Sequence, residues 1–138
     1  MTGIPTAAII IENLKGEVLL QLRENKPNLP FANYWTLPGG KVEHGETPLQ
    51  AAMRELQEET ELDTPLSFWK MYERLGNKNI KIEQYVFKGV TNASIENIVV
   101  GEGAALRFVA DKDIQSLKIA YGFDKLIEEF FFTKNKAK

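Results

Sequence analysis

The chain contains no cysteine. This absence excludes disulfide frameworks, zinc–thiolate sites and thiol nucleophiles, and it gives no sign of an oxidising compartment. His44 is the only histidine, which excludes a histidine relay and a multi-histidine metal site. The apolar run at residues 7–11 is far too short to cross a membrane or to serve as a signal sequence. We therefore expect a cytoplasmic protein with no membrane association.

Neither sign of charge is in large excess. The formal net charge is -2 and the pI is about 5.5, which argues against duplex nucleic acid as a partner. A free nucleotide as ligand is compatible with this charge. A length of 138 residues, with 43% hydrophobic and 26% charged residues, predicts one globular domain over residues 1–138. We expect its short basic end, residues 133–138, to be frayed. The sequence leaves the oligomeric state open, a homodimer included.

Hydrophobic patterning predicts a sheet that begins with a hairpin. Residues 6–12 and 17–23 are rich in Val, Ile and Leu, and they flank a turn in which Gly16 supplies the positive φ. Further strand-like segments lie at 34–37, 66–74, 80–88 and 104–110. A phase slip between Ile82 and Tyr85 predicts a β-bulge there.

Apolar residues at helical spacing predict a C-terminal helix over residues 122–132 that covers one face of the sheet. The expected fold class is therefore α/β (α+β), a sandwich with a mixed β-sheet between helices.

A second helix is predicted from about Thr47 to Thr60. Thr47 is a good N-cap, Pro48 suits the first helical position, and Gln50 completes a capping box. At about 100° per residue, three glutamates share an arc of roughly 100°, and a neighbouring apolar arc is expected to pack. The glutamates are Glu55, Glu58 and Glu59, and the apolar residues are Leu49, Ala52, Met53 and Leu56.

Three carboxylates on one helix face repel one another by about a few tenths of a kcal/mol per pair. Oxygen ligands that converge from one face are what Mg²⁺ or Mn²⁺ prefers, and Mg²⁺ commonly combines carboxylates with waters and phosphate oxygens. A solvated acidic face is the alternative interpretation of the glutamates alone.

The spacing around these glutamates resembles the signature of the Nudix hydrolase family, G-x5-E-x7-R-E-U-x-E-E-x-G-U, where U is aliphatic. Eight of the nine specified positions match: Gly40, Glu46, Arg54, Glu55, Leu56, Glu58, Glu59 and Leu62. We call the segment from Gly40 to Leu62 the Nudix box. The preceding residues 35–39 are also similar to the family's approach to the box.

Glu61 stands where the family usually has glycine. Glycine there would end the helix in the left-handed conformation, which costs a non-glycine residue roughly 1 kcal/mol. A negative charge at a helix C-terminus also opposes the helix dipole. The departure removes no expected metal ligand, so it concerns stability and loop geometry.

The resemblance implies a Nudix-type α/β/α sandwich and a divalent-metal cofactor, Mg²⁺ with Mn²⁺ as an alternative. It implies that Glu55, Glu58 and Glu59, joined by the Gly40 carbonyl, bind the metal, and that Arg54 orients the glutamates. Glu46 is expected to support them without binding the metal.

The general base varies within the family. Glu102 is our first candidate outside the box because it sits between Gly101 and Gly103, where a loop could carry it over the metal. A surface glutamate in a glycine turn is an equally good interpretation. Glu96 and Glu55 are alternatives.

Four residues are candidate substrate contacts. Arg23 could bind a phosphate, and Phe31, Tyr34 and Tyr85 could stack on a nucleobase. Each also has a plainer interpretation as a surface or core residue.

The resemblance implies hydrolysis of a nucleoside diphosphate linked to a group X. We expect a (d)NTP pyrophosphatase of the kind that sanitises the nucleotide pool. The alternatives are a Nudix-fold nucleotide sensor without catalysis and a hydrolase of nucleotide sugars or RNA 5′ ends.

Overall fold

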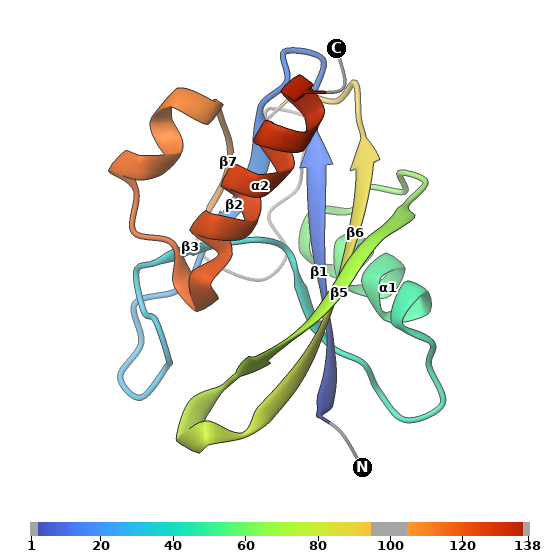
Figure 1. The fold of residues 1–138 in the computed structure, drawn as a ribbon, viewed down its shortest axis with the longest axis vertical. Coiled ribbons are helices and arrows are strands. Elements are labelled where there is room, and N and C mark those ends of the chain that lie inside the picture. Colours follow the sequence, from blue (N-terminus) through green and yellow to red (C-terminus); the bar gives the residue numbers. More distant parts are fainter. Residues whose placement is uncertain (1–2, 95–104, 137–138) are drawn as a thin grey trace.

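The computed structural model describes residues 3–94 and 105–136, which form a seven-stranded sheet with helices on it (Figure 1). The strands are β1 (Ile4–Glu12), β2 (Val18–Leu22), β3 (Trp35–Thr36), β4 (Gly39–Lys41), β5 (Ser67–Leu75), β6 (Lys81–Val90) and β7 (Ala105–Val109). The helices are α1 (Pro48–Thr60) and α2 (Phe123–Lys136), with 3₁₀ turns η1 (Asn77–Asn79), η3 (Asp111–Ser116) and η4 (Ala120–Gly122).

Strand β1 is the centre of the sheet, whose order is β3-β2-β1-β6-β5. It runs parallel to β6 over its whole length and antiparallel to β2, so the sheet is mixed as expected. The predicted hairpin joins β1 to β2, with Gly16 at φ 78°. Along residues 6–8 of β1 the neighbour is β4 instead of β2. This register places the two glycines of β4 beside the middle of the sheet.

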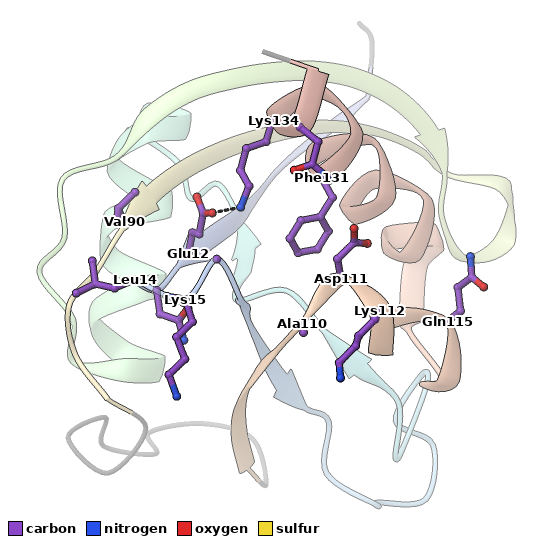
Figure 2. Close-up of a pocket in the computed structure, with 13 residues that line it drawn as sticks. Glu12, Leu14, Lys15, Val90, Ala110, Asp111, Lys112, Gln115, Phe131 and Lys134 are labelled. Carbon is purple, nitrogen blue, oxygen red and sulfur yellow. Dashed lines mark hydrogen bonds and ion pairs between the residues drawn. The ribbon is translucent and has the colours of Figure 1, made fainter. Parts of the chain in front are cut away.

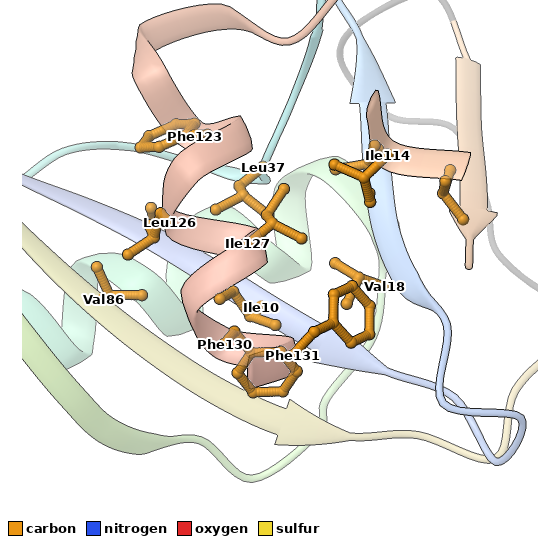
Figure 3. Packing of buried hydrophobic residues seen from close by; sticks show 13 residues of the cluster. Ile10, Val18, Leu37, Val86, Ile114, Phe123, Leu126, Ile127, Phe130 and Phe131 are labelled. Carbon is orange, nitrogen blue, oxygen red and sulfur yellow. The ribbon is translucent and has the colours of Figure 1, made fainter. Parts of the chain in front are cut away.

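Alternate residues of β1 pack on opposite faces of the sheet, which explains its continuous apolar run. Ile10 belongs to a core that includes Ile127 and Phe130 of α2, shown in Figure 3. Ile9 belongs to a second core that includes Leu56 of α1. The two helices therefore cover opposite faces, and the expected sandwich is confirmed.

The β-bulge lies on β5, not on β6 as predicted. The register between these strands shifts between Phe68 and Lys70, whereas β6 pairs with β1 without interruption. Because β6 is buried between two partners and β5 lies at the edge of the sheet, the extra residue, Trp69, is accommodated on the edge strand.

Helix α2 continues to Lys136 and so includes residues 133–136 of the basic end. Lys134 forms an ion pair with Glu12 at the end of β1, as Figure 2 shows. Its ammonium also lies 5.3 Å from the centre of the Phe131 ring. These contacts hold the last turn against the sheet.

The packed face of α1 also differs in part from the prediction. Ala52 and Leu56 are buried as expected, whereas Leu49 and Met53 are 40% and 49% exposed. The packed arc is turned toward the acidic residues and includes Glu59, which is 6% exposed. One of the three predicted metal ligands therefore lies at the interface between α1 and the sheet.

Candidate active site

The two ends of α1 hold the acidic residues in place. At its start, the Thr47 hydroxyl accepts a hydrogen bond from the Gln50 amide at 3.1 Å, and the Gln50 side chain accepts one from the Thr47 amide at 2.8 Å. This is the predicted capping box. At its end, Glu61 is left-handed with φ 59°, although it has a side chain. The family's glycine position therefore keeps its usual conformation here.

Arg54 is the centre of the acidic cluster. Its Nε and Nη2 atoms donate to the two carboxylate oxygens of Glu46 at 2.7 and 3.0 Å. Its Nη1 atom donates to Glu55 at 3.1 Å and to Glu58 at 3.2 Å. Nη2 also reaches the carbonyl of Lys41, next to the glycines of β4, at 3.2 Å. One guanidinium thus ties the helix to its preceding loop and to the sheet.

These hydrogen bonds shift the acidities of the partners. The bond to Arg54 lowers the pKa of Glu46, and a further hydrogen bond from the Glu43 amide adds to the effect. The same bond to Glu46 raises the pKa of Arg54. Both groups are therefore charged at neutral pH.

The glycines of β4 bring the backbone against the glutamates of α1. The Gly39 amide donates to Glu59 at 2.9 Å. A side chain on Gly40 would overlap the Glu55 carboxylate, and one on Gly39 would overlap the Ala7 carbonyl. Only glycine permits this close approach, which places the peptide of Gly40 beside a predicted metal ligand.

The donor types of this cluster fit a hard divalent cation. Four carboxylates, those of Glu43, Glu46, Glu55 and Glu58, lie within 3.6 Å of the Arg54 guanidinium, which can neutralise only one of them. The side chains do not, however, form a ready-made cage. Within residues 3–94 and 105–136, no three acidic or histidine side chains are gathered closely enough to hold a metal ion.

Two adjoining cavities open beside the cluster. One, of about 250 Å³, is lined by Gly40 and Glu59 and by Arg23 of the loop after β2. The other, of about 860 Å³, lies between Phe31 and the β5–β6 end of the sheet. Lys41 and Tyr121 line both cavities. Together they offer a cationic and a largely apolar compartment next to the acidic residues.

A larger cavity, of about 1000 Å³, lies elsewhere, where β1 ends and α2 finishes (Figure 2). It is lined by Glu12, Lys15, Lys112 and Lys134 among others, and by none of the predicted site residues. The predicted site residues therefore do not coincide with this larger cavity.

Comparison with known families agrees with this geometry. A family model described as NUDIX domain matches residues 3–130. The chain belongs to the Nudix family. The resemblance that the signature indicated is thereby confirmed, and it extends over nearly the whole chain. Nudix hydrolases generally use divalent metal ions.

Curated Nudix relatives have more than one substrate. The 8-oxo-dGTP diphosphatase of Escherichia coli is 41% identical over 75 residues, 54% of this chain and 55% of that protein. The RNA pyrophosphohydrolase of Azorhizobium caulinodans is 30% identical over 128 residues, 88% of this chain and 71% of that protein. The m7GpppN-mRNA hydrolase NUDT17 of Xenopus laevis is 44% identical over 64 residues, 46% of this chain. The match spans only 21% of that last protein's length.

Solved Nudix structures share the fold. The MutT protein of Methanosarcina mazei superposes with a TM-score of 0.81 at 26% identity, and the match covers 98% of this chain and 96% of that one.

The predicted substrate contacts fall into two groups. Phe31 lies edge-on to Tyr34 and to Tyr121, with ring centres 5.3 and 4.8 Å apart, and Arg23 lies over the Tyr121 ring at 5.5 Å. Tyr85 lies apart from them, because it packs with the core on the α1 face of the sheet. The structure therefore brings three of the four together.

Three residues at these cavities, Lys41, Arg74 and Tyr121, were missed by sequence reasoning. Arg74 of β5 and Tyr121 of η4 line the larger cavity, and the Arg74 guanidinium lies 5.2 Å from the Tyr121 ring centre. The sequence signal that could have pointed to Tyr121 is the glycine that follows it, ahead of α2. In the structure, both Tyr121 and Gly122 have positive φ.

The candidate general bases Glu102 and Glu96 lie outside the described residues. Among the described residues, no helix is long and apolar enough to cross a membrane.

Proposed function

We propose that this Nudix chain is a Mg²⁺-dependent pyrophosphohydrolase of nucleoside triphosphates, with Mn²⁺ as an alternative metal. Water would attack one phosphorus of the diphosphate linkage, the bond from that phosphorus to the bridging oxygen would break, and nucleoside monophosphate and pyrophosphate would leave. The observation that most directly supports this proposal is the acidic cluster around Arg54 beside Gly40. The cluster lies at the edge of a cavity that is also lined by Arg23 and Lys41.

Glu55, Glu58 and Glu59 would hold the metal, with the Gly40 carbonyl as a further ligand. The chemistry that the metal supplies is Lewis-acid neutralisation of the diphosphate and a lower pKa for an attacking water. Arg54 is a positioning residue, because its Nη1 atom already bridges Glu55 and Glu58. Glu46 fixes the other edge of that guanidinium.

The adjoining cavities support a nucleotide as substrate. Arg23 and Lys41 provide cationic groups in the compartment next to Gly40 and Glu59, which suits phosphates. Phe31 and Tyr121 provide aromatic surface in the larger compartment, which suits a base. Proton removal from the water is assigned to Glu102, with Glu55 as the alternative.

The test is hydrolysis of a panel: the common NTPs and dNTPs, 8-oxo-dGTP, ADP-ribose and a 5′-triphosphorylated RNA. Each is incubated with Mg²⁺ or Mn²⁺, and product masses locate the broken bond. We expect monophosphate and pyrophosphate from at least one triphosphate. Loss of turnover on metal removal is also expected.

Two matched variants control this assay. Glu58→Gln removes one charge from the cluster and should lower kcat by about a hundredfold or more. Glu129→Gln removes one charge from an exposed position on α2, where Glu129 forms a surface ion pair with Lys70, and should leave kcat unchanged. If the wild-type protein binds a nucleotide but turns over no substrate with either metal, the chain is a sensor and the hydrolase proposal is wrong.

A second candidate is removal of pyrophosphate from RNA 5′ ends. It is favoured by the RNA pyrophosphohydrolase relative, whose match covers 88% of this chain. A free triphosphate and a triphosphorylated RNA with the same first nucleotide distinguish the two proposals. The first predicts a higher kcat/KM for the free nucleotide, and the second predicts the reverse.

A further inference from the structure

Two arginine side chains lie over the ring of Tyr121. The guanidinium carbon of Arg23 is 5.5 Å from the centre of its ring, and that of Arg74 is 5.2 Å away. The backbone of Tyr121 is left-handed, with φ 62°, a conformation that costs a bulky residue free energy and tends to occur where function requires it. The next residue, Gly122, also has positive φ. The stack is therefore held by an unusual local backbone.

Arg74 is a half-buried cation without a carboxylate partner. Its Nε atom donates to the side-chain oxygen of Gln84 at 3.0 Å, and Gln84 is 1% exposed. Burial lowers the pKa of Arg74. Among the described residues, no carboxylate forms an ion pair with it. Stacking on Tyr121 offsets part of the cost of burial but does not satisfy the terminal N–H donors.

The cavity next to Arg74 has the character of a nucleobase pocket. Its volume is about 860 Å³, within the range of small-ligand sites. Most of its wall is apolar, contributed by Leu29, Pro30, Phe31, Leu75, Ile80 and Ile82. Arg74 is the one side chain of this wall that is both cationic and half-buried in the described structure, so it offers hydrogen-bond donors in apolar surroundings.

We propose that Arg74 selects a purine base that carries a 6-oxo group. This inference rests on the proposed function, because it takes the larger cavity as the base compartment of a nucleotide site. A guanidinium has only donors. Guanine presents two acceptors, O6 and N7, that a guanidinium can engage together, whereas adenine presents an amino donor at position 6. A half-buried arginine that forms no ion pair within the described residues therefore favours guanine and disfavours adenine.

The position of Arg74 favours the base over the phosphates. Arg23 and Gly40 line the smaller cavity beside the acidic cluster, and Arg74 lines only the larger one. Tyr121 lies at the boundary between the two cavities, since it lines both of them. Arg23, which lines the cavity beside the acidic residues, is placed for phosphate, and Arg74, which lines the larger cavity, is placed for the base.

The experiment compares guanine with 2-aminopurine, which lacks the 6-oxo group and retains the 2-amino group and N7. Affinities of the two ribonucleoside monophosphates are measured by calorimetry, so that the result does not depend on turnover or on an anhydride bond. The kcat/KM values of the two triphosphates are measured beside them. We expect the wild-type protein to prefer guanine about tenfold in both assays. In Arg74→Met the ratio should fall to about one.

A second variant covers the case in which Arg74→Met does not fold. Arg74→Lys keeps the charge but loses the planar pair of donors, so the ratio should fall at least about threefold. If the variants lose affinity equally for the guanine and the 2-aminopurine nucleotide, Arg74 binds phosphate or supports the fold instead of reading the base. That result would overturn the proposal. A wild-type protein that does not distinguish the bases would also overturn it. Absence of all hydrolysis with a preserved guanine preference would instead count against the hydrolase proposal alone.

Discussion

Replacement of Glu61 by glycine should stabilise the protein. Glu61 ends α1 with φ 59° and ψ 15°, a conformation that costs a residue with a Cβ about 1 to 2 kcal/mol. Glycine removes this cost but adds about 0.4 to 1 kcal/mol of unfolded-chain entropy. Loss of a negative charge at the helix C-terminus contributes about 0.3 to 1 kcal/mol in the stabilising direction. The net gain is about 1 kcal/mol, which corresponds to a rise in Tm of about 3 to 4 °C for a chain of this size.

Glu61→Gln is the matched control for this prediction, because it removes the charge and keeps the Cβ. Calorimetry or thermal denaturation of both variants separates the two contributions. Glu61→Gly should be more stable than Glu61→Gln by several tenths of a kcal/mol. If the two variants have the same Tm, the reasoning from backbone strain is refuted. Neither change touches the Arg54 hydrogen bonds, so kcat/KM should be unchanged in both.

Three further perturbations test the site and the core. The bond to Arg54 lowers the pKa of Glu46 from its ordinary value of 4.5. The Glu46 carboxylate therefore stabilises the folded state above pH 4.5, and this stabilisation is lost as the pH falls through the lowered pKa of Glu46 in the folded protein. The Tm difference between wild type and Glu46→Gln should therefore be constant at neutral pH and disappear in strong acid; a difference that persists there contradicts the assignment. Gly40→Ala should lower kcat and metal affinity about tenfold or more, because the new Cβ overlaps the Glu55 carboxylate, and metal titration by calorimetry measures the loss. Ile127→Ala should lower the free energy of unfolding by about 2 to 5 kcal/mol in urea denaturation, because Ile127 of α2 is fully buried in the core between this helix and the sheet.

Features that depend on neighbours along the chain could be predicted from the sequence. The capping box at Thr47 and Gln50 and the placement of the glutamates on α1 each depend on a short segment. The hairpin at Gly16 is of the same kind. Local dihedral preferences and helical spacing are sufficient to fix such features, and the family's spacing joins them into one pattern.

Features that depend on pairing between distant segments could not be predicted. Alternation in β6 places Tyr85 and Gln84 on opposite faces, but it does not say which face meets the smaller cavity, which Gln84 lines. Strand β4 contains two glycines, which have little strand preference, and it exists because β1 pairs with it. The stack of Arg23, Tyr121 and Arg74 joins three remote segments, and no periodicity links them.

The acidic cluster shows why the fold and the proposed chemistry depend on the same residues. Arg54 relieves the repulsion among the glutamates, and through the Lys41 carbonyl it also binds the helix to β4. A single guanidinium cannot neutralise its four carboxylate neighbours, so a large negative charge persists beside Gly40. That residual charge favours a bound divalent cation, and the cation in turn favours an anionic substrate in the adjoining cavity. The arginine therefore makes the cluster compatible with folding without removing the negative charge on which the proposed metal binding depends.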